Sequence, residues 1–132
     1  MIVMKKGIEK YLSEFEEKPP STKKRYASSI ADKAKEKPDE VADYVPLIQP
    51  HIDVSRSEVD EEAVEDLLTA VGKVGEEYPE VVLPLVPQLK DCFDNGLETA
   101  EYMNAVAASY ALGMVAKEYP NVAEENIPRL VE

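Results

Sequence analysis

Side chains that commonly catalyse reactions or bind metals are scarce in this sequence of 132 residues. It contains one histidine, His51, and one cysteine, Cys92. A metal site rich in Cys or His is therefore excluded, and so is a triad that needs His beside Ser or Cys. The two residues lie 41 positions apart and are followed by apolar residues, Ile52 and Phe93. This setting favours packing positions that are half-buried over a ligand or a nucleophile.

Carboxylates are abundant, with 27 Asp and Glu against 15 Lys and Arg and a net charge of −12. An acid–base pair needs a pocket that separates the pKa values of its two carboxyl groups, and the sequence shows no sign of one. We therefore expect a protein that is not an enzyme and has no cofactor. One dense acidic cluster could dock a basic segment of a partner, hold a hard cation such as Ca²⁺, or simply be a solvated face. It consists of Asp60, Glu61, Glu62, Glu65 and Asp66. Because the cluster lacks the loop spacing of an EF-hand, we predict no metal site.

Tyrosine and methionine side chains form a second unusual group. Met103, Ala107, Tyr110 and Met114 follow the spacing i, i+4, i+7 and i+11, which places them on one stripe of a helix. With Tyr102 beside them, they form an apolar surface of the kind that marks protein interfaces. The alternative is that this helix is more deeply buried than its neighbours.

Helices are expected to position all of these residues, because apolar side chains recur at helical spacing along the whole chain. The predicted helices cover 3–16, 21–37, 38–52, 55–77, 79–93, 97–118 and 120–132, with no strand between them.

Proline, hydroxyl and glycine signals set the expected boundaries. Pro38 and Pro79 suit the first turn of a helix, whereas Pro46 lies inside an apolar pattern and should bend it. Ser55 to Glu58 matches a capping box that would start a helix. The run Asp94-Asn95-Gly96 predicts a turn.

The helices repeat with a period of 41 residues. Prolines recur at 38, 79 and 120 and again at 46, 87 and 128. Small residues recur in the second helix of each pair and would let neighbouring backbones approach closely; they are Ala31, Gly72 and Gly113, and Ala34, Gly75 and Ala116. Apolar residues recur in the first helix: Val41, Val82 and Ala123; Val45, Val86 and Ile127; Ile48, Leu89 and Leu130. A fixed period built from helix pairs is typical of an α-solenoid.

The repeat makes the Tyr and Met stripe stand out. In the other two units the positions equivalent to 102, 103, 107, 110 and 114 are mostly polar or charged. They are Glu61, Glu62, Asp66, Thr69 and Lys73, and Pro20, Ser21, Arg25, Ser28 and Asp32. A surface that is solvated in two units is therefore apolar in the third.

The period, the internal proline of each first helix and the aspartate turn that follows it, at Asp53 and Asp94, resemble those of HEAT-repeat proteins, which belong to the armadillo-like α-solenoids. The internal prolines stand in the segments ADYVPLI, VLPLVPQL and ENIPRL, and the last second helix ends in Ala111-Leu112-Gly113. This resemblance implies an all-α fold of about seven helices in a single domain over 1–132. Its parts would be a capping helix at 1–19 and repeat units at 20–53, 54–94 and 95–132.

The same resemblance implies a scaffold that binds another protein on a curved surface. We expect contact through Tyr102, Met103, Tyr110 and Met114, with Glu61, Glu62, Glu65 and Asp66 as an acidic flank for a basic segment. A homo-oligomer is the main alternative. A nucleic-acid accessory role is less favoured, because the net charge of −12 repels phosphate and Lys23-Lys24-Arg25 is the only basic run of three. No apolar run approaches the roughly 18 residues of a membrane span, and the apolar stretch at residues 1–4 is too short for the hydrophobic region of a signal peptide. We therefore expect a cytoplasmic protein that does not bind membranes.

Overall fold

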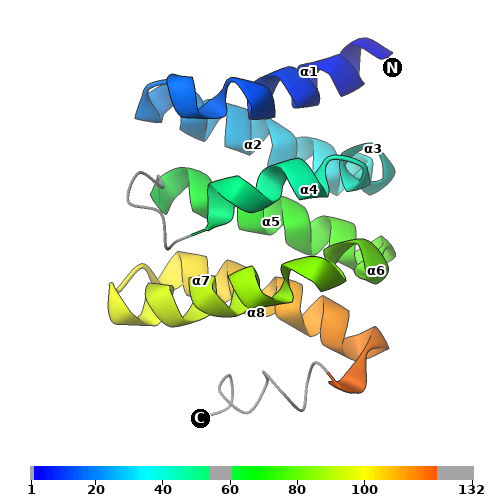
Figure 1. The fold of residues 1–132 in the computed structure, drawn as a ribbon, viewed down its shortest axis with the longest axis vertical. Coiled ribbons are helices and arrows are strands. Elements are labelled where there is room, and N and C mark those ends of the chain that lie inside the picture. The colour runs from blue at the N-terminus through cyan, green and yellow to red at the C-terminus, as the bar shows by residue number, and fades with distance from the viewer. Residues whose placement is uncertain (1, 54–60, 122–132) are drawn as a thin grey trace.

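The computed structural model describes residues 2–53 and 61–121, with side chains for 8–15, 17–53 and 63–121. Every regular element in these ranges is a helix (Figure 1), which confirms the all-α prediction. The chain begins with α1 (Ile2–Ser13) and the short 3₁₀ helix η1 (Phe15–Glu17). The longer α2 (Pro20–Glu36) follows, with Pro19 at its N-cap and Pro20 at its first position. Proline fits this place because the first helical turn needs no backbone N–H donor.

Prolines divide the next segment into short helices. The chain forms α3 (Pro38–Ala42), α4 (Val45–Ile48) and the 3₁₀ helix η2 (Gln49–Ile52). The bend predicted at Pro46 is a full break between α3 and α4. Pro46 has no N–H to bond the Ala42 carbonyl, and its ring would collide with that carbonyl in a continuous helix.

The equivalent segment 41 residues later is interrupted in the same way. It forms α6 (Pro79–Val82), the 3₁₀ helix η3 (Leu83–Leu85) and α7 (Val86–Glu98). Pro79 opens α6, and Pro87 lies in the first turn of α7. The repeated prolines therefore produce repeated breaks.

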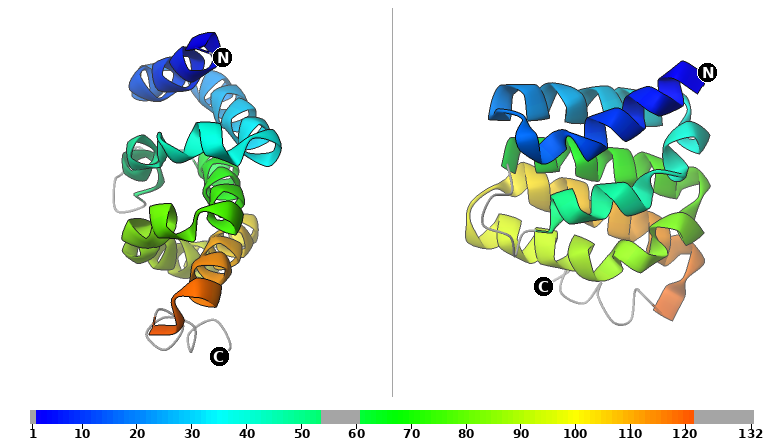
Figure 2. Two further views of the ribbon diagram at one scale, coloured as in Figure 1. Left: turned by 90° about the vertical axis from the view of Figure 1, so that its right-hand side faces the viewer. Right: turned by 45° about the horizontal axis from the view of Figure 1, so that its top comes forward.

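The two remaining helices are long and unbroken, namely α5 (Glu61–Glu77) and α8 (Tyr102–Glu118). Together with α2 they form one layer, in which α5 packs between α2 and α8 (Figure 2). The proline-broken segments α3–η2 and α6–α7 lie with α1 in a second layer. One apolar core fills the space between the layers.

Residues at repeated positions supply much of this core. Val41 and Val82 are fully buried, and so are Ile48 and Leu89, which confirms the apolar stripe predicted for the first helices. The second helices contribute equivalent side chains as well, among them Ile30, Val71 and Leu112. Within the described part of the chain, no helix combines the length and apolar character that crossing a membrane requires.

The turn predicted at Asp94-Asn95-Gly96 is wrong. Helix α7 continues to Glu98, and the chain reverses over Thr99 to Glu101, where Ala100 has a left-handed φ of 63°. Gly96 is needed for packing instead: a Cβ atom there would lie 2.8 Å from the backbone nitrogen of Ala105. Asp94 is therefore a helical residue, and the helix expected from residue 97 begins at Tyr102.

Some predictions fall outside the described residues. They are the capping box from Ser55 to Glu58, Asp60 of the acidic cluster, and the last predicted helix beyond residue 121.

Candidate protein-binding surface

Helix α8 carries an uncharged surface in a strongly charged protein. Residues 102–116 include no Asp, Glu, Lys or Arg, although the chain as a whole has 42 such residues, 27 acidic and 15 basic. One face of α8 packs into the core through Ala108, Ala111, Leu112 and Val115. The rest of α8 combines buried residues, among them Asn104, Ala105 and Ala107, with exposed apolar side chains.

Three large apolar side chains near the start of α8 face solvent. Tyr102 and Met103 are each 60% exposed and Val106 is 58% exposed. Leu97, close to the end of α7, is 49% exposed. We call Tyr102, Met103 and Val106 the α8 patch. An exposed cluster of this kind has a hydration cost that binding another apolar surface would remove.

The other two residues of the predicted contact, Tyr110 and Met114, lie against α5. The Tyr110 ring covers Gly72, leaving no room for a Cβ atom on that glycine. A Cβ on Gly75 would lie 3.4 Å from the Cβ of Met114. Both α8 residues are half-buried. The predicted stripe is therefore divided between an exposed start and a packed continuation.

Tyr110 has two polar features at this helix contact. The Nζ atom of Lys73 lies 5.4 Å from the centre of the Tyr110 ring, within range of a cation–π interaction. The Tyr110 hydroxyl is buried, and among the described residues it has no hydrogen-bond partner. The ring therefore contributes to packing between α5 and α8 more than its hydroxyl contributes to polar contacts.

The acidic residues predicted to flank this contact are placed differently from one another. Glu61 and Glu62 belong to the first turn of α5, but their side chains lie outside those described. Glu65 is half-buried on the same helix. The starts of α5 and α8 lie on the same side of the molecule, so these glutamates are on the helix next to the α8 patch (Figure 1).

Asp66 faces α2 instead. Burial raises the pKa of its carboxyl group above the ordinary value of 3.8. Lys24 and Lys35 on α2 oppose this shift in pKa, and Asp32 adds to it. The residue therefore belongs to the contact between α2 and α5. Lys24 is engaged there, and the neighbouring Lys23 places its Nζ 5.9 Å from the centre of the Phe15 ring.

His51 and Cys92 make matching contacts; His51 is half-buried as predicted, whereas the same prediction is wrong for Cys92, which is fully buried. The Nε2 atom of His51 lies 3.2 Å from the Leu12 carbonyl oxygen, and the ring packs against Phe15 with 4.7 Å between ring centres. The Cys92 thiol donates to the Ile52 carbonyl at 3.1 Å and is 1% exposed. Each side chain thus ties its segment to the preceding segment of the same layer.

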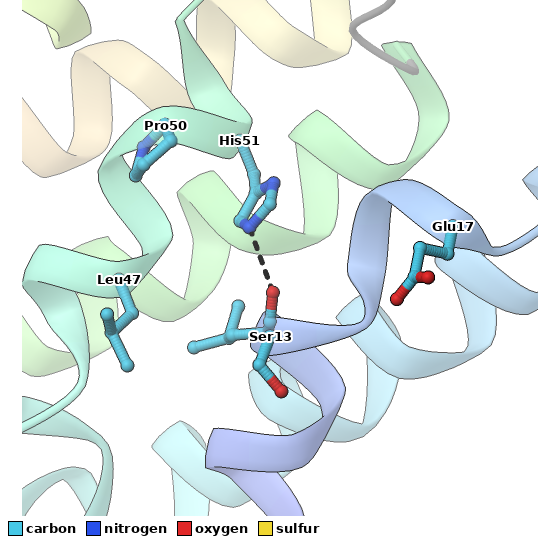
Figure 3. Close-up of a pocket in the computed structure, with 6 residues that line it drawn as sticks. Ser13, Glu17, Leu47, Pro50 and His51 are labelled. Atoms are coloured by element: carbon cyan, nitrogen blue, oxygen red, sulfur yellow. Dashed lines mark hydrogen bonds between the residues drawn. The ribbon is translucent and has the colours of Figure 1, made fainter.

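A cavity of about 440 Å³ opens beside His51, between the end of α1 and the segment α4–η2 (Figure 3). Its lining is Leu12, Ser13, Glu17, Leu47, Pro50 and His51. The His51 ring in this cavity is already engaged with the Leu12 carbonyl. Within the described residues, no three His, Cys, Asp or Glu side chains gather closely enough to hold a metal ion.

Val106 and Leu97 are exposed residues that the sequence analysis did not identify. A signal for Val106 existed, because its equivalents one and two periods earlier are Glu65 and Lys24. The contrast that singled out Tyr102 and Met103 therefore extends to this position. Leu97 offered no comparable signal, since it lay in a predicted boundary region.

Neither a protein-family model, nor a curated protein, nor a solved structure matches this chain.

Proposed function

We propose that the chain is a small α-solenoid of HEAT type that acts as an interaction module for another protein. Support for the solenoid comes from the 41-residue period and from the two layers, in which equivalent helices succeed one another. Equivalent side chains at positions 51 and 92 also make equivalent contacts between successive segments.

The binding surface in this proposal is the start of α8. The exposure of Tyr102 and Met103, each 60% accessible, is the observation that carries it. Large amphipathic or flexible apolar side chains are favoured in protein interfaces because they bury much area on contact. Further along α8, Tyr110 and Met114 pack on Gly72 and Gly75 and so hold the helix that carries the patch against α5.

The partner in this proposal carries a basic segment beside an apolar anchor. On the neighbouring helix α5, the repeat positions equivalent to the α8 patch are the acidic residues Glu61, Glu62 and Glu65. Opposite charge beside an apolar contact raises the association rate and selects partners more than it adds affinity. Asp66 takes no direct part, because it faces Lys24 and Lys35 of α2.

Selection of displayed peptides on the purified chain, followed by titration of the selected peptides, tests this function. We expect selected sequences to combine an apolar residue with Lys or Arg, and Met103→Glu to weaken their binding by at least about tenfold. Leu47→Glu is the matched control, since Leu47 is 45% exposed in the other layer. Peptides that bind the wild type and Met103→Glu equally well would contradict the assignment of the surface.

A further inference from the structure

The cavity beside His51 has an apolar end and an acidic end. Leu47 and Pro50 lie on one side of the His51 ring, and Glu17 lies on the other (Figure 3). Between the two ends, the Nε2 atom of His51 lies 3.2 Å from the Leu12 carbonyl oxygen, which holds the ring in place. All residues that line the cavity are among those whose side chains the structure describes. Its volume of about 440 Å³ falls within the range of roughly 300–1,000 Å³ that is typical of small-molecule sites.

The apolar end of the cavity is not repeated in the next unit. Leu47 is 45% exposed although it is a large apolar side chain, and Pro50 on η2 is exposed as well. One period later, the equivalent residues are Gln88 and Asp91, which are polar. The chain therefore carries apolar side chains at these positions in the unit that forms the cavity and polar ones in the unit that follows. A ligand with an apolar body would remove the hydration cost of Leu47.

The acidic end of the cavity is formed by Glu17, which is exposed at the end of η1. Its neighbour in sequence, Lys18, is paired with Glu14 at 3.4 Å, and Lys23 places its Nζ atom 5.9 Å from the centre of the Phe15 ring. Across the described part of the chain, no ion pair involves Glu17. The net charge of −12 adds to the attraction for a cation. The carboxylate can therefore bind an ammonium group.

We propose that this cavity binds a small primary amine with an apolar body. The ammonium group lies beside Glu17, and the apolar body covers Leu47 and Pro50. Ser13 also lines the cavity, and its hydroxyl donates to the Lys10 carbonyl at 3.1 Å, which leaves the lone pairs of its oxygen to accept from the ammonium group. The cavity belongs to the layer of α1 and the proline-broken segments. It is separate from the α8 patch and does not depend on the proposed protein-binding function.

The walls of the cavity are fixed before a ligand binds. They come from two segments, the end of α1 with η1 and the segment α4–η2, and the contact between His51 and Leu12 ties one segment to the other. Binding to a cavity that is already formed requires little ordering of the protein, so even a small ligand can bind measurably. An anionic ligand is disfavoured, because its charge would meet Glu17 and the net negative charge of the chain.

Amide NMR spectra recorded during titration with phenylbutylamine test the site. We expect the signals of Ser13, Leu47 and His51 to shift, with a dissociation constant on the order of 1 mM or lower. Phenylbutanol, which has the same apolar body without the charge, should bind about threefold more weakly, and phenylbutanoate more weakly still. A wild type in which these signals do not shift overturns the proposal. So does a wild type that binds the amine and the carboxylate equally well.

Three variants test the two ends of the cavity separately. Glu17→Gln should abolish the preference for phenylbutylamine over phenylbutanol and leave the binding of phenylbutanol unchanged. Leu47→Ala should weaken the binding of both by at least about threefold, because it removes apolar contact area. Leu97→Ala is the matched control, since Leu97 is 49% exposed outside the cavity and its truncation should leave both dissociation constants unchanged.

Circular dichroism establishes that each variant is folded. A preference for the amine that survives Glu17→Gln overturns the role of that carboxylate, and wild-type binding by Leu47→Ala overturns the apolar contact. Shifts confined to the start of α8 would place the amine on the protein-binding surface and overturn the assignment to this cavity.

Discussion

Helices α5 and α8 occupy equivalent places one period apart, yet they present opposite surfaces. Helix α5 carries charged residues at most of its outer positions and packs between α2 and α8. Helix α8 has no charged residue from 102 to 116, and in the described chain α5 is its neighbour within the same layer, with α7 packed against it from the other layer. The comparison shows that, in this molecule, the apolar character of a helix does not determine how much of its surface is buried. The charged helix is enclosed, and the uncharged helix is partly open.

Truncation of one core and one exposed side chain on α8 should produce the largest contrast. Leu112 is 1% exposed, so Leu112→Ala leaves a cavity and should lower the free energy of unfolding by about 2–5 kcal/mol. Val106→Ala should change it by no more than about 0.5 kcal/mol, because Val106 is 58% exposed. Urea unfolding of both variants, followed by circular dichroism, measures the two changes. A loss for Val106→Ala as large as that for Leu112→Ala would mean that the α8 patch is part of the core.

Replacing the equivalent glycines of α5 and α8 by alanine should change the free energy of unfolding in opposite directions. In Gly113→Ala the new methyl group meets no described atom, so the gain in helix propensity should stabilise the protein by up to about 1 kcal/mol. In Gly72→Ala the methyl group collides with the Tyr110 ring, and overpacking of about 1–3 kcal/mol should outweigh that gain.

The repeat supplies a control for this comparison. One period earlier, on α2 and α5, the equivalents of Gly72 and Tyr110 are Ala31 and Thr69. There a residue larger than glycine is combined with a residue smaller than tyrosine. Adding Tyr110→Thr to Gly72→Ala should therefore recover part of the lost stability. Thermal unfolding at low protein concentration measures all three variants. Equal shifts for Gly72→Ala and Gly113→Ala would show that the ring moves aside without cost.

The smallest expected effect concerns Asp66, whose equivalent on α8 is the uncharged Ala107. Because burial raises the pKa of Asp66 in the folded protein, its ionised form opposes folding at neutral pH. Asp66→Asn should therefore be more stable than the wild type at neutral pH.

This advantage should depend on pH in a defined direction. The folded state binds the Asp66 proton more tightly than the unfolded state, so the penalty is complete above the raised pKa. It disappears as the pH falls below the ordinary value of 3.8. Urea unfolding of wild type and variant across this range measures the difference. A wild type that is the more stable protein at neutral pH would show that Lys24 and Lys35 outweigh burial.

The helices and the repeat were predictable from the sequence because they depend on local chemistry. Apolar spacing placed Val41, Ile48, Val82 and Leu89 on buried faces, and the missing N–H of proline is enough to interrupt a helix wherever it falls. The prediction of a turn at Asp94-Asn95-Gly96 was wrong because Gly96 lies within a helix and permits its close contact with α8. Glycine favours turns and close helix packing for the same reason, the absence of a Cβ atom.

The candidate surface was only partly predictable. The contrast between units pointed to Tyr102 and Met103, which are exposed, and equally to Tyr110 and Met114, which pack on α5. All four residues have similar chemistry and helical spacing. Which of them are exposed and which are packed depends on where α5 passes beside α8. Gly72 and Gly75 set this place because they allow the two helices to approach closely.

The sequence by itself determined that this protein is helical, that its first helices break at proline, and that its apolar positions recur every 41 residues. These properties follow from backbone sterics and from the 3.6-residue period of each helix. Only the tertiary structure decided which apolar surfaces are covered, because burial is a property of neighbouring helices and not of the residue itself. Among the described helices of this layer, α5 has a neighbour on each side, whereas α8 has one on a single side, and Tyr102, Met103 and Val106 at the start of α8 are exposed.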